Sequence, residues 1–248
     1  MELPAIARFL PAIVEPWLAG IADPPAAQQA VLQELLAGYA RTGYGREHGA
    51  GSVGSMDDYR RAFPVITYAD YVPLFERVRA GELDYLLPEP LVCIAMTRGT
   101  TGRSKLIPVT ESDMDVRLGS VRTVVNYIIR REAYDLFAGC NLNLCFPSAM
   151  GTMRIGDRDV EYGYTSGIYA RQAASNTSMR LVPAQDEIDA LGIGMAKADW
   201  DRRFELAYQR AKGENVVILG GVMQMFLNFA RFLKKEHGVY PRDLWNIR

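Results

Sequence analysis

The sequence predicts an α/β fold from three observations. Amphipathic helical patterns alternate with short apolar runs typical of strands along the chain, an order that favours helices packed against sheets. A chain of 248 residues can bury a substantial core in one large domain or two small ones. Apolar residues make up 49% and charged residues 23% of the sequence, as in an ordinary globular protein.

The charge and hydropathy patterns of the sequence indicate which partners the protein has and where in the cell it lies. A formal net charge of −1 predicts no overall field that would recruit nucleic acid or anionic lipid. The N-terminus has no basic region and charged residues interrupt its apolar ones, unlike a signal peptide. The uncharged run from Asn215 to Ala230 is too short to span a bilayer comfortably. We therefore expect a cytoplasmic protein with neither nucleic acid nor membrane as a partner.

The cysteines and histidines exclude several kinds of site. Cys93, Cys140 and Cys145 are odd in number and lack metal-ligand spacing. Cys93 and Cys145 lie in apolar, strand-like runs, so we expect buried free thiols in a reducing compartment. His48 and His237 are the only histidines and lie in polar helix-end contexts. We expect neither a histidine triad nor a zinc site, and the pattern assigns no catalytic side chain or metal ligand.

The first part of the chain is predicted to be helical. Residues 2–20 indicate a helix with prolines near its turns. Ala26 to Arg41 indicates a second, because apolar residues recur there at helical spacing and Gly43 can cap its end. Thr42 to Ser55 is expected to be a glycine-rich connection.

Two further helices are expected before the first strand. Asp57 to Phe63 predicts a short helix that Pro64 stops. Thr67 can cap the next helix, with Asp70 completing a capping box and Gly81 at its end. One face of this helix is apolar and is predicted to lie in the core rather than on a substrate: Tyr68, Tyr71, Leu74, Phe75 and Val78.

Two apolar runs, Leu91 to Met96 and Leu106 to Val109, enclose a loop of glycines and hydroxylated residues that ends in a lysine. Glycines let successive N–H groups turn toward one point, and such a concavity binds anions. The threonine hydroxyls add donors, and Lys105 adds a mobile charge suited to phosphate. We interpret the segment as a phosphate-binding hairpin. A glycine-rich turn that merely joins two strands is the alternative.

The spacing within this loop excludes two familiar nucleotide motifs. Gly99 and Gly102 are three residues apart and Lys105 follows three later, whereas a P-loop needs G-x-x-x-x-G-K-[ST] before a helix. The fingerprint G-x-G-x-x-G is also absent.

Beyond the hairpin, Thr110 and Asp113 predict a capping box that begins a long helix to about Arg131. Arg117 and Arg122 near its start either face the site or lie on a solvated face. Further along, strand alternation is predicted for Asn141 to Phe146, and a hairpin turn for Ile155 to Val160.

The last part alternates again between helix and strand. Gly163 to Tyr169 is expected to form a second loop. Ala196 to Lys212 predicts an amphipathic helix, and Val216 to Leu219 a buried strand. The segment Gly220-Gly221-Val222 then opens another helix.

The pattern T-x-G-T-T-G-x-x-K, from Thr97 to Lys105, resembles the phosphate loop of the adenylate-forming superfamily of acyl-CoA synthetases and luciferases. The block Phe63 to Glu82 is similar to the segment before that loop in the auxin-responsive acyl acid amido synthetases, and the continuation from Lys105 to Pro108 agrees. The resemblance implies ATP and Mg²⁺ as cofactors. It implies nucleotide binding by Thr97, Arg98, Gly99, Thr100, Thr101, Gly102 and Lys105. Arg98 replaces a residue that is usually small, and either adds charge toward a phosphate or crowds the loop.

The resemblance also implies where the acid binds. Gly163 to Tyr169 falls where the resembling enzymes have a glycine-containing segment beside the acyl pocket. The start of the last long helix corresponds to a strand–GVP–helix element that lines the same pocket. Substrate contacts are thus implied for Thr165, Ser166, Tyr169, Val222 and Met223. Small loop residues need no such role, and Met223 stands where proline is usual, so the pocket's shape stays open.

The resemblance extends over nearly the whole chain but over only about the first half of a family member. We therefore expect a partial sequence: an N-terminal portion of a large domain with mixed sheets flanked by helices, comprising a helical lead-in (about 1–85) and a phosphate-loop and acyl-pocket region (about 86–248).

The implied reaction activates a carboxylic acid to an acyl-adenylate with ATP and then conjugates it to an amino acid or other amine, without a general base. The 248 residues alone are expected to be inactive. Two alternatives stay open: a non-catalytic nucleotide- or acid-binding module, and a structural domain that has lost the site.

Overall fold

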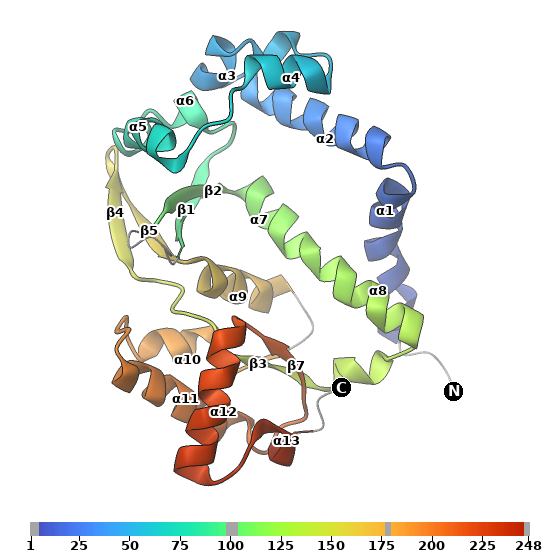
Figure 1. Ribbon diagram of the computed structural model, residues 1–248, viewed down its shortest axis with the longest axis vertical. Helices are drawn as coiled ribbons and strands as arrows, with labels where there is room; N and C mark the ends of the chain where they lie inside the picture. The colour runs from blue at the N-terminus through green and yellow to red at the C-terminus, as the bar shows by residue number, and fades with distance from the viewer. Residues whose placement is uncertain (1–4, 98–103, 177–179, 246–248) are drawn as a thin grey trace.

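The computed structural model describes residues 5–97, 104–176 and 180–245 (Figure 1). Those residues form an α/β fold in which a four-stranded and a three-stranded sheet are flanked by helices, as the sequence predicts. Helices α2 to α4 lie at one end of the molecule, the four-stranded sheet lies in the middle, and the three-stranded sheet lies at the other end. None of the helices in these ranges is long and apolar enough to cross a membrane.

The N-terminal region is helical as expected. A short 3₁₀ helix, η1 (Ala5–Arg8), precedes α1 (Leu10–Ala22) and α2 (Pro24–Tyr39). Asp23 starts α2 by accepting a hydrogen bond from the Ala26 backbone N–H at 3.2 Å. Leu10 and Val14 of α1 pack against α8, which holds the lead-in against the rest of the molecule.

The glycine-rich connection expected over 42–55 is partly helical. It contains α3 (Gly43–Glu47) and the 3₁₀ helix η2 (Ala50–Ser52). Gly43 is the first residue of α3 and does not cap α2, because the Thr42 hydroxyl accepts from the Gly45 N–H at 3.0 Å and so starts a new helix.

The two helices that follow are confirmed, and the second begins at its predicted capping box. Helix α4 covers Met56–Ala62, and α5 covers Tyr68–Arg79 with the capping box between Thr67 and Asp70. Phe75 and Val78 of α5 are buried, so the apolar face belongs to the core as predicted. A short helix, α6 (Leu83–Leu86), leads into the first strand.

The four-stranded sheet has the order β2-β1-β5-β4. Strands β1 (Leu91–Met96) and β2 (Leu106–Thr110) pair antiparallel, as do β4 (Gly151–Ile155) and β5 (Arg158–Tyr164), which confirms both predicted hairpins. Strand β1 pairs parallel to β5, with Met96 opposite Tyr164. The carboxyl ends of β1 and β5 therefore meet at one edge of the sheet.

The predicted helix from Thr110 to Arg131 is interrupted. The structure has α7 (Glu111–Leu118), a 3₁₀ turn η3 (Gly119–Val121), and α8 (Arg122–Arg131). Glycine and serine at 119–120 are weak helix formers, and a tighter turn there breaks the α-helical repeat. Helices α7 and α8 run along one side of the molecule between the two sheets (Figure 1).

The second sheet is parallel, with the order β6-β3-β7: β3 (Cys140–Asn143), β6 (Arg180–Val182) and β7 (Val216–Gly220). The 3₁₀ helix η4 (Tyr134–Ala138) precedes it, and α10 (Gln185–Ala190), α11 (Lys197–Ala211), α12 (Met223–His237) and α13 (Pro241–Leu244) accompany it. The predicted helices α11 and α12 and the strand β7 are confirmed, but only Val216 of β7 is buried.

The predicted strand 141–146 ends early, at Asn143. The side-chain oxygen of Asn143 accepts from the Cys145 N–H at 3.0 Å, which turns the chain out of the sheet. Cys145 therefore lies after the strand and is only partly buried, in contrast to the expectation, whereas Cys93 and Cys140 are buried free thiols.

The predicted loop Gly163 to Tyr169 is also wrong, because it is the end of β5 followed by helix α9 (Thr165–Asn176). Close packing explains why glycine occupies positions 163 and 167. A Cβ on Gly163 would lie 1.7 Å from the Ser148 carbonyl oxygen, and one on Gly167 would lie 2.2 Å from that of Phe146. The connection between β3 and β4 thus crosses directly over the start of α9.

Candidate functional site

The candidate site is the edge of the four-stranded sheet where β1 and β5 end side by side. Thr97 follows β1, and Thr165 follows β5 as the first residue of α9. The Thr165 hydroxyl donates to the Met96 carbonyl at 3.2 Å, which joins the start of α9 to the end of β1. The structure therefore brings one predicted nucleotide residue and one predicted substrate residue to the same edge.

The mouth of the predicted phosphate-binding hairpin is closed by two hydrogen bonds between Thr97 and Lys105. The Thr97 N–H donates to the Lys105 carbonyl at 2.9 Å. The Lys105 N–H donates to the Thr97 hydroxyl oxygen at 3.3 Å. Residues 98–103 lie outside the described residues, and these include the predicted contacts Arg98, Gly99, Thr100, Thr101 and Gly102.

Tyr68, from the first turn of α5, supports this mouth. Its hydroxyl oxygen accepts from the Leu106 N–H at 2.8 Å. The Lys105 Nζ lies 5.4 Å from the centre of the Tyr68 ring, within reach of a cation–π attraction. The Tyr68 ring attracts the charge of Lys105. Because Lys105 is exposed, that charge is also accessible to a ligand. The sequence placed Tyr68 on the core face of its helix, and nothing local indicated this contact.

The first turn of α9 is tied to the connection that follows β3. The Ser166 hydroxyl oxygen accepts from the Phe146 N–H at 3.3 Å. Burial raises the pKa of the neighbouring Cys145 thiol to about 11, while a hydrogen bond with Ser166 opposes that rise. The thiol is therefore protonated at neutral pH. The Ser166 hydroxyl already contacts the chain near Phe146 and Cys145, whether or not it also contacts a ligand.

Tyr169 lies one turn further along α9, against α7. Its ring centre is 5.4 Å from the Arg117 guanidinium carbon, and Arg117 pairs with Asp113 at 3.0 Å. The Tyr169 hydroxyl is buried without a hydrogen-bond partner among the described residues, and burial raises its pKa to about 12. The structure thus places Tyr169 in the contact between α7 and α9.

A buried polar network from α10 supports the β3–β4 connection and was not predicted. The Asp189 carboxylate accepts from the Ser148 N–H at 2.7 Å and from the Ser148 hydroxyl at 2.5 Å. Gln185 donates to the Phe146 carbonyl at 3.0 Å and accepts from Asn143 at 3.1 Å. The segment that packs on the start of α9 is therefore held from its other side by α10.

Val222 and Met223 lie at the carboxyl edge of the other sheet, at the start of α12. Their exposed fractions are 49% and 71%. They are therefore open to contact, but on a different sheet from Thr165 and Ser166.

The described residues offer no obvious metal ligands. Within ranges 5–97, 104–176 and 180–245, no group of three or more histidine, cysteine, aspartate or glutamate side chains could hold a metal ion. The arrangement is suited instead to an anion, with one mobile cation, hydroxyl donors and the N-terminus of α9, whose dipole attracts negative charge.

Comparison with known proteins identifies a family. The model of the "GH3 family N-terminal domain" matches residues 19–188. A probable indole-3-acetic acid-amido synthetase, GH3.4 of Oryza sativa subsp. japonica, is 33% identical over 123 residues, which are 48% of this chain and 19% of that protein. The indole-3-acetic acid-amido synthetase GH3.2 of Arabidopsis thaliana is 30% identical over 97 residues, 38% of this chain and 18% of that protein.

Two solved structures share the fold. The AtGH3.15 acyl acid amido synthetase in complex with 2,4-DB has a TM-score of 0.61 and 20% identity, over 84% of this chain and 35% of that chain. Another GH3.15 acyl acid amido synthetase structure has a TM-score of 0.61 and 19% identity, over 95% of this chain and 39% of that chain. The chain thus spans little more than a third of these solved relatives.

Proposed function

Because this chain belongs to the GH3 family, we propose that it is the phosphate-binding and acid-binding part of a ligase that uses ATP to join a carboxylic acid to an amino acid or another amine. Enzymes of this family use ATP. One solved relative is an acyl acid amido synthetase in complex with 2,4-DB, which supports an acid as the substrate of this lineage. Within the chain, residues 1–85 form the helical lead-in and residues 86–248 supply the site.

The observation that supports this proposal most strongly is the convergence of the hairpin mouth with the start of α9. Thr97, Lys105 and Thr165 lie within the family match at 19–188 and meet where β1 and β5 end. In open α/β sheets, ligands bind at the carboxyl ends of strands. The same edge thus offers a phosphate grip beside a place for the acid.

The chemistry assigns a simple task to these residues. An acid carboxylate attacks the α-phosphorus of ATP, the bond to the β-phosphate oxygen breaks, and pyrophosphate leaves with its negative charge. Donors that already point at the departing phosphates stabilise that charge, and losing one costs about 3 kcal/mol. Lys105 supplies the cation, and Thr97, Arg98, Gly99, Thr100, Thr101 and Gly102 supply N–H and hydroxyl donors.

Mg²⁺ neutralises phosphate charge when it accompanies the nucleotide. The described residues contain no cluster of carboxylates, histidines and cysteines that fits the ion, so we assign it no ligand in this chain.

The acid is placed against the start of α9. Thr165 and Ser166 are the proposed nearest contacts, since the N-terminus of α9 attracts a carboxylate. Tyr169, Val222 and Met223 remain proposed contacts for the acid's body.

Titration with ATP and Mg²⁺, together with a pyrophosphate-exchange assay over a panel of carboxylic acids, tests this function. Lys105→Ala should weaken ATP binding by roughly tenfold or more, because a charge-assisted phosphate contact is lost. The free energy of unfolding should change by less than about 0.5 kcal/mol, since the side chain is exposed.

Lys212→Ala is a matched control. The Lys212 Nζ lies 5.4 Å from the centre of the Tyr208 ring, the same arrangement as Lys105 on Tyr68. Lys212 directly follows α11 and is not part of the proposed phosphate site. That variant should bind ATP like the parent chain. Equal ATP affinity in the parent and Lys105→Ala would refute the phosphate assignment. ATP binding without exchange is the result expected of this chain, because its 248 residues alone are predicted to be inactive, and exchange by the chain would refute that prediction.

A further inference from the structure

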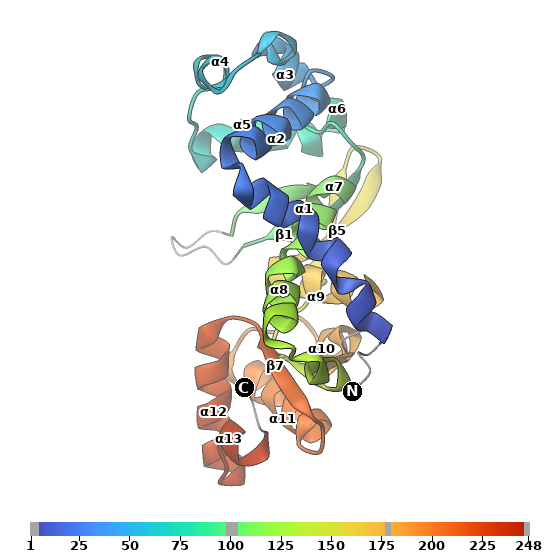
Figure 2. The same ribbon diagram turned by 90° about the vertical axis from the view of Figure 1, so that its right-hand side faces the viewer.

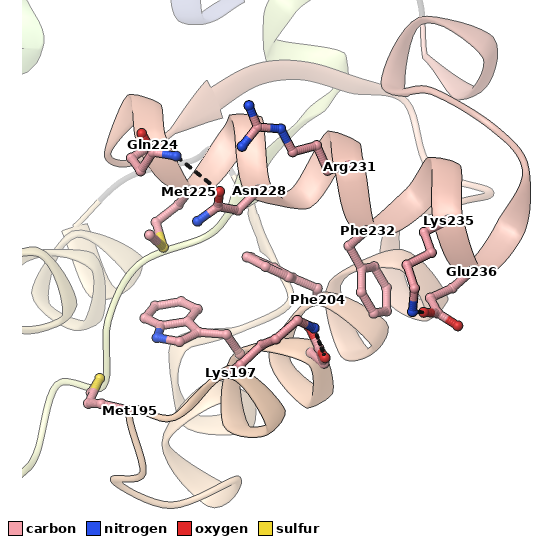
Figure 3. Close-up of a pocket in the computed structure, with 12 residues that line it drawn as sticks. Met195, Lys197, Phe204, Gln224, Met225, Asn228, Arg231, Phe232, Lys235 and Glu236 are labelled. Carbon is pink, nitrogen blue, oxygen red and sulfur yellow. Dashed lines mark hydrogen bonds and ion pairs between the residues drawn. The ribbon is translucent and has the colours of Figure 1, made fainter.

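A groove lies between α11 and α12, apart from the candidate site (Figure 3). Its volume is about 610 Å³, within the range of roughly 300–1,000 Å³ that small-molecule sites occupy. The floor is aromatic, with Trp200 and Phe204 contributed by α11 and Phe232 by α12. The ring centres of Phe204 and Phe232 are 5.7 Å apart, so they form a continuous apolar face.

A polar rim runs along α12 beside this floor. Gln224, Asn228 and Arg231 are spaced four and three residues apart, so they share one face of the helix. Gln224 donates its side-chain N–H to the Asn228 side-chain oxygen at 3.0 Å. That bond fixes the orientation of the Asn228 amide and leaves its NH₂ group as a donor. Figure 3 shows Arg231 extending back along α12 toward Asn228.

Arg231 differs from the two lysines of the groove in having no carboxylate partner among the described residues. Lys197 pairs with Asp201 at 2.5 Å, and Lys235 pairs with Glu236. In the part of the chain that the structure describes, no carboxylate lies within ion-pairing distance of the exposed Arg231. An arginine fork matches a carboxylate with two parallel hydrogen bonds. The rim thus adds a guanidinium and an amide donor to a groove whose floor is aromatic.

We propose that the α11–α12 groove binds a small monocarboxylate with an aromatic or alkyl body. The body lies on Phe204, Phe232 and Trp200, and the carboxylate accepts hydrogen bonds from Arg231 and Asn228. A neutral apolar molecule would leave the guanidinium unused, and a polyanion would set its charge against the aromatic floor at a desolvation cost. A single carboxylate on an apolar body fits both surfaces.

This site is separate from the proposed ATP site. Trp200 stacks edge-on against Phe146 at 4.8 Å, and Phe146 lies 5.0 Å from Tyr164, the residue before α9. The two regions are joined by these rings, but the groove uses none of the phosphate-binding residues. Binding of an acid here does not depend on ATP or on catalysis, so the inference goes beyond the proposed function.

Calorimetric titration of the full chain with 4-phenylbutanoate, and with 4-phenylbutanamide as the uncharged counterpart, tests the proposal. The acid should bind more tightly than the amide. Arg231→Gln should weaken acid binding roughly tenfold, the equivalent of one charge-assisted contact, and leave amide binding unchanged. Asn228→Asp should also weaken acid binding, because it places a like charge at the rim.

Arg202→Gln is the matched control, because Arg202 is an exposed arginine of α11 that pairs with Asp199 and does not line the groove. It should bind the acid like the parent. Equal acid affinity in the parent, Arg231→Gln and Asn228→Asp would overturn the proposal, as would preference for the amide. Acid binding that Ser166→Ala weakens and Arg231→Gln retains would place the acid at the sheet edge instead. Thermal unfolding of each variant confirms its fold, and Asn228→Asp decides the matter should Arg231→Gln unfold.

Discussion

Ser148 is completely buried, and both of its hydrogen-bond donors depend on one carboxylate. Its N–H and its hydroxyl donate to the two oxygens of Asp189 at 2.7 and 2.5 Å. Asp189→Asn would turn an amide NH₂ toward one of these donors and leave a buried group unpaired. We expect a loss of about 2 kcal/mol in the free energy of unfolding, measured by urea denaturation.

Asp186→Asn provides the comparison for that measurement. Asp186 is an exposed residue of the same short helix, α10, and the change should cost less than about 0.5 kcal/mol. A similar loss in both variants would mean that the negative charge on α10, and not the contact with Ser148, accounts for the stabilisation.

At the scale of residues, the sequence predicts candidate contacts from local patterns but does not reveal contacts between residues far apart in the chain. Thr97 and Lys105 could be proposed as phosphate contacts because glycine, threonine and lysine between two apolar runs suggest a phosphate loop. The hydrogen bond from Leu106 to Tyr68 spans 38 residues, and that from Ser148 to Asp189 spans 41. No periodicity or capping pattern reports such pairs, because they exist only once the sheets are assembled.

At the scale of elements, correct predictions came from signals contained within a few residues. The capping box at Thr67 and both hairpins were predicted correctly because their geometry is set by neighbouring residues. Gly163 and Gly167 misled the prediction, since glycine usually marks a loop. Here it makes room for the carbonyls of Ser148 and Phe146, so a tertiary contact determines the residue choice.

Substitution of glycine tests that explanation. Gly163→Ala would place a Cβ 1.7 Å from the Ser148 carbonyl oxygen, so the backbone must shift, and we expect a loss of about 2 kcal/mol or more in unfolding free energy. Gly119→Ala meets no atom within 4 Å, and Gly119 has a helical backbone (φ −59°, ψ −15°). That change should stabilise the chain by about 0.5–1 kcal/mol through reduced chain entropy.

Thermal and urea unfolding of both variants measures the difference. An Ala at 163 tolerated as well as an Ala at 119 would show that the β3–β4 connection can move away from β5. Close packing would then not explain why residue 163 is glycine.

At the scale of the whole molecule, packing is unequal between the two ends. The cluster around the three-stranded sheet has 14 buried residues, including Trp200, Phe204 and Phe229. The cluster under α2 has 4: Leu32, Leu36, Ala50 and Val53. Figures 1 and 2 show α2 to α4 at the end of the molecule opposite to α11 and α12. Local stability follows buried apolar contact, so the two ends should open with different free energies.

Hydrogen exchange can measure this difference, because α2 and α11 are matched in length at 16 and 15 residues. Intrinsic propensity favours α2, which is rich in alanine, glutamine and leucine. Its packing is poorer: Val31 and Leu35 are each 54% exposed, whereas Phe204 and Ala207 of α11 are 3% and 0% exposed. Tertiary packing contributes more to helix stability in proteins than propensity does.

We therefore expect amides in the middle of α11 to exchange at least roughly a hundredfold more slowly than those in the middle of α2, a difference of about 2.7 kcal/mol in opening free energy. Mass spectrometry of peptides from the two helices under native conditions measures the rates. Equal rates would mean that the two ends open together in a single global transition. Slower exchange in α2 would mean that propensity outweighs burial in this chain, because α2 is favoured by its residues and α11 by the core on which it packs.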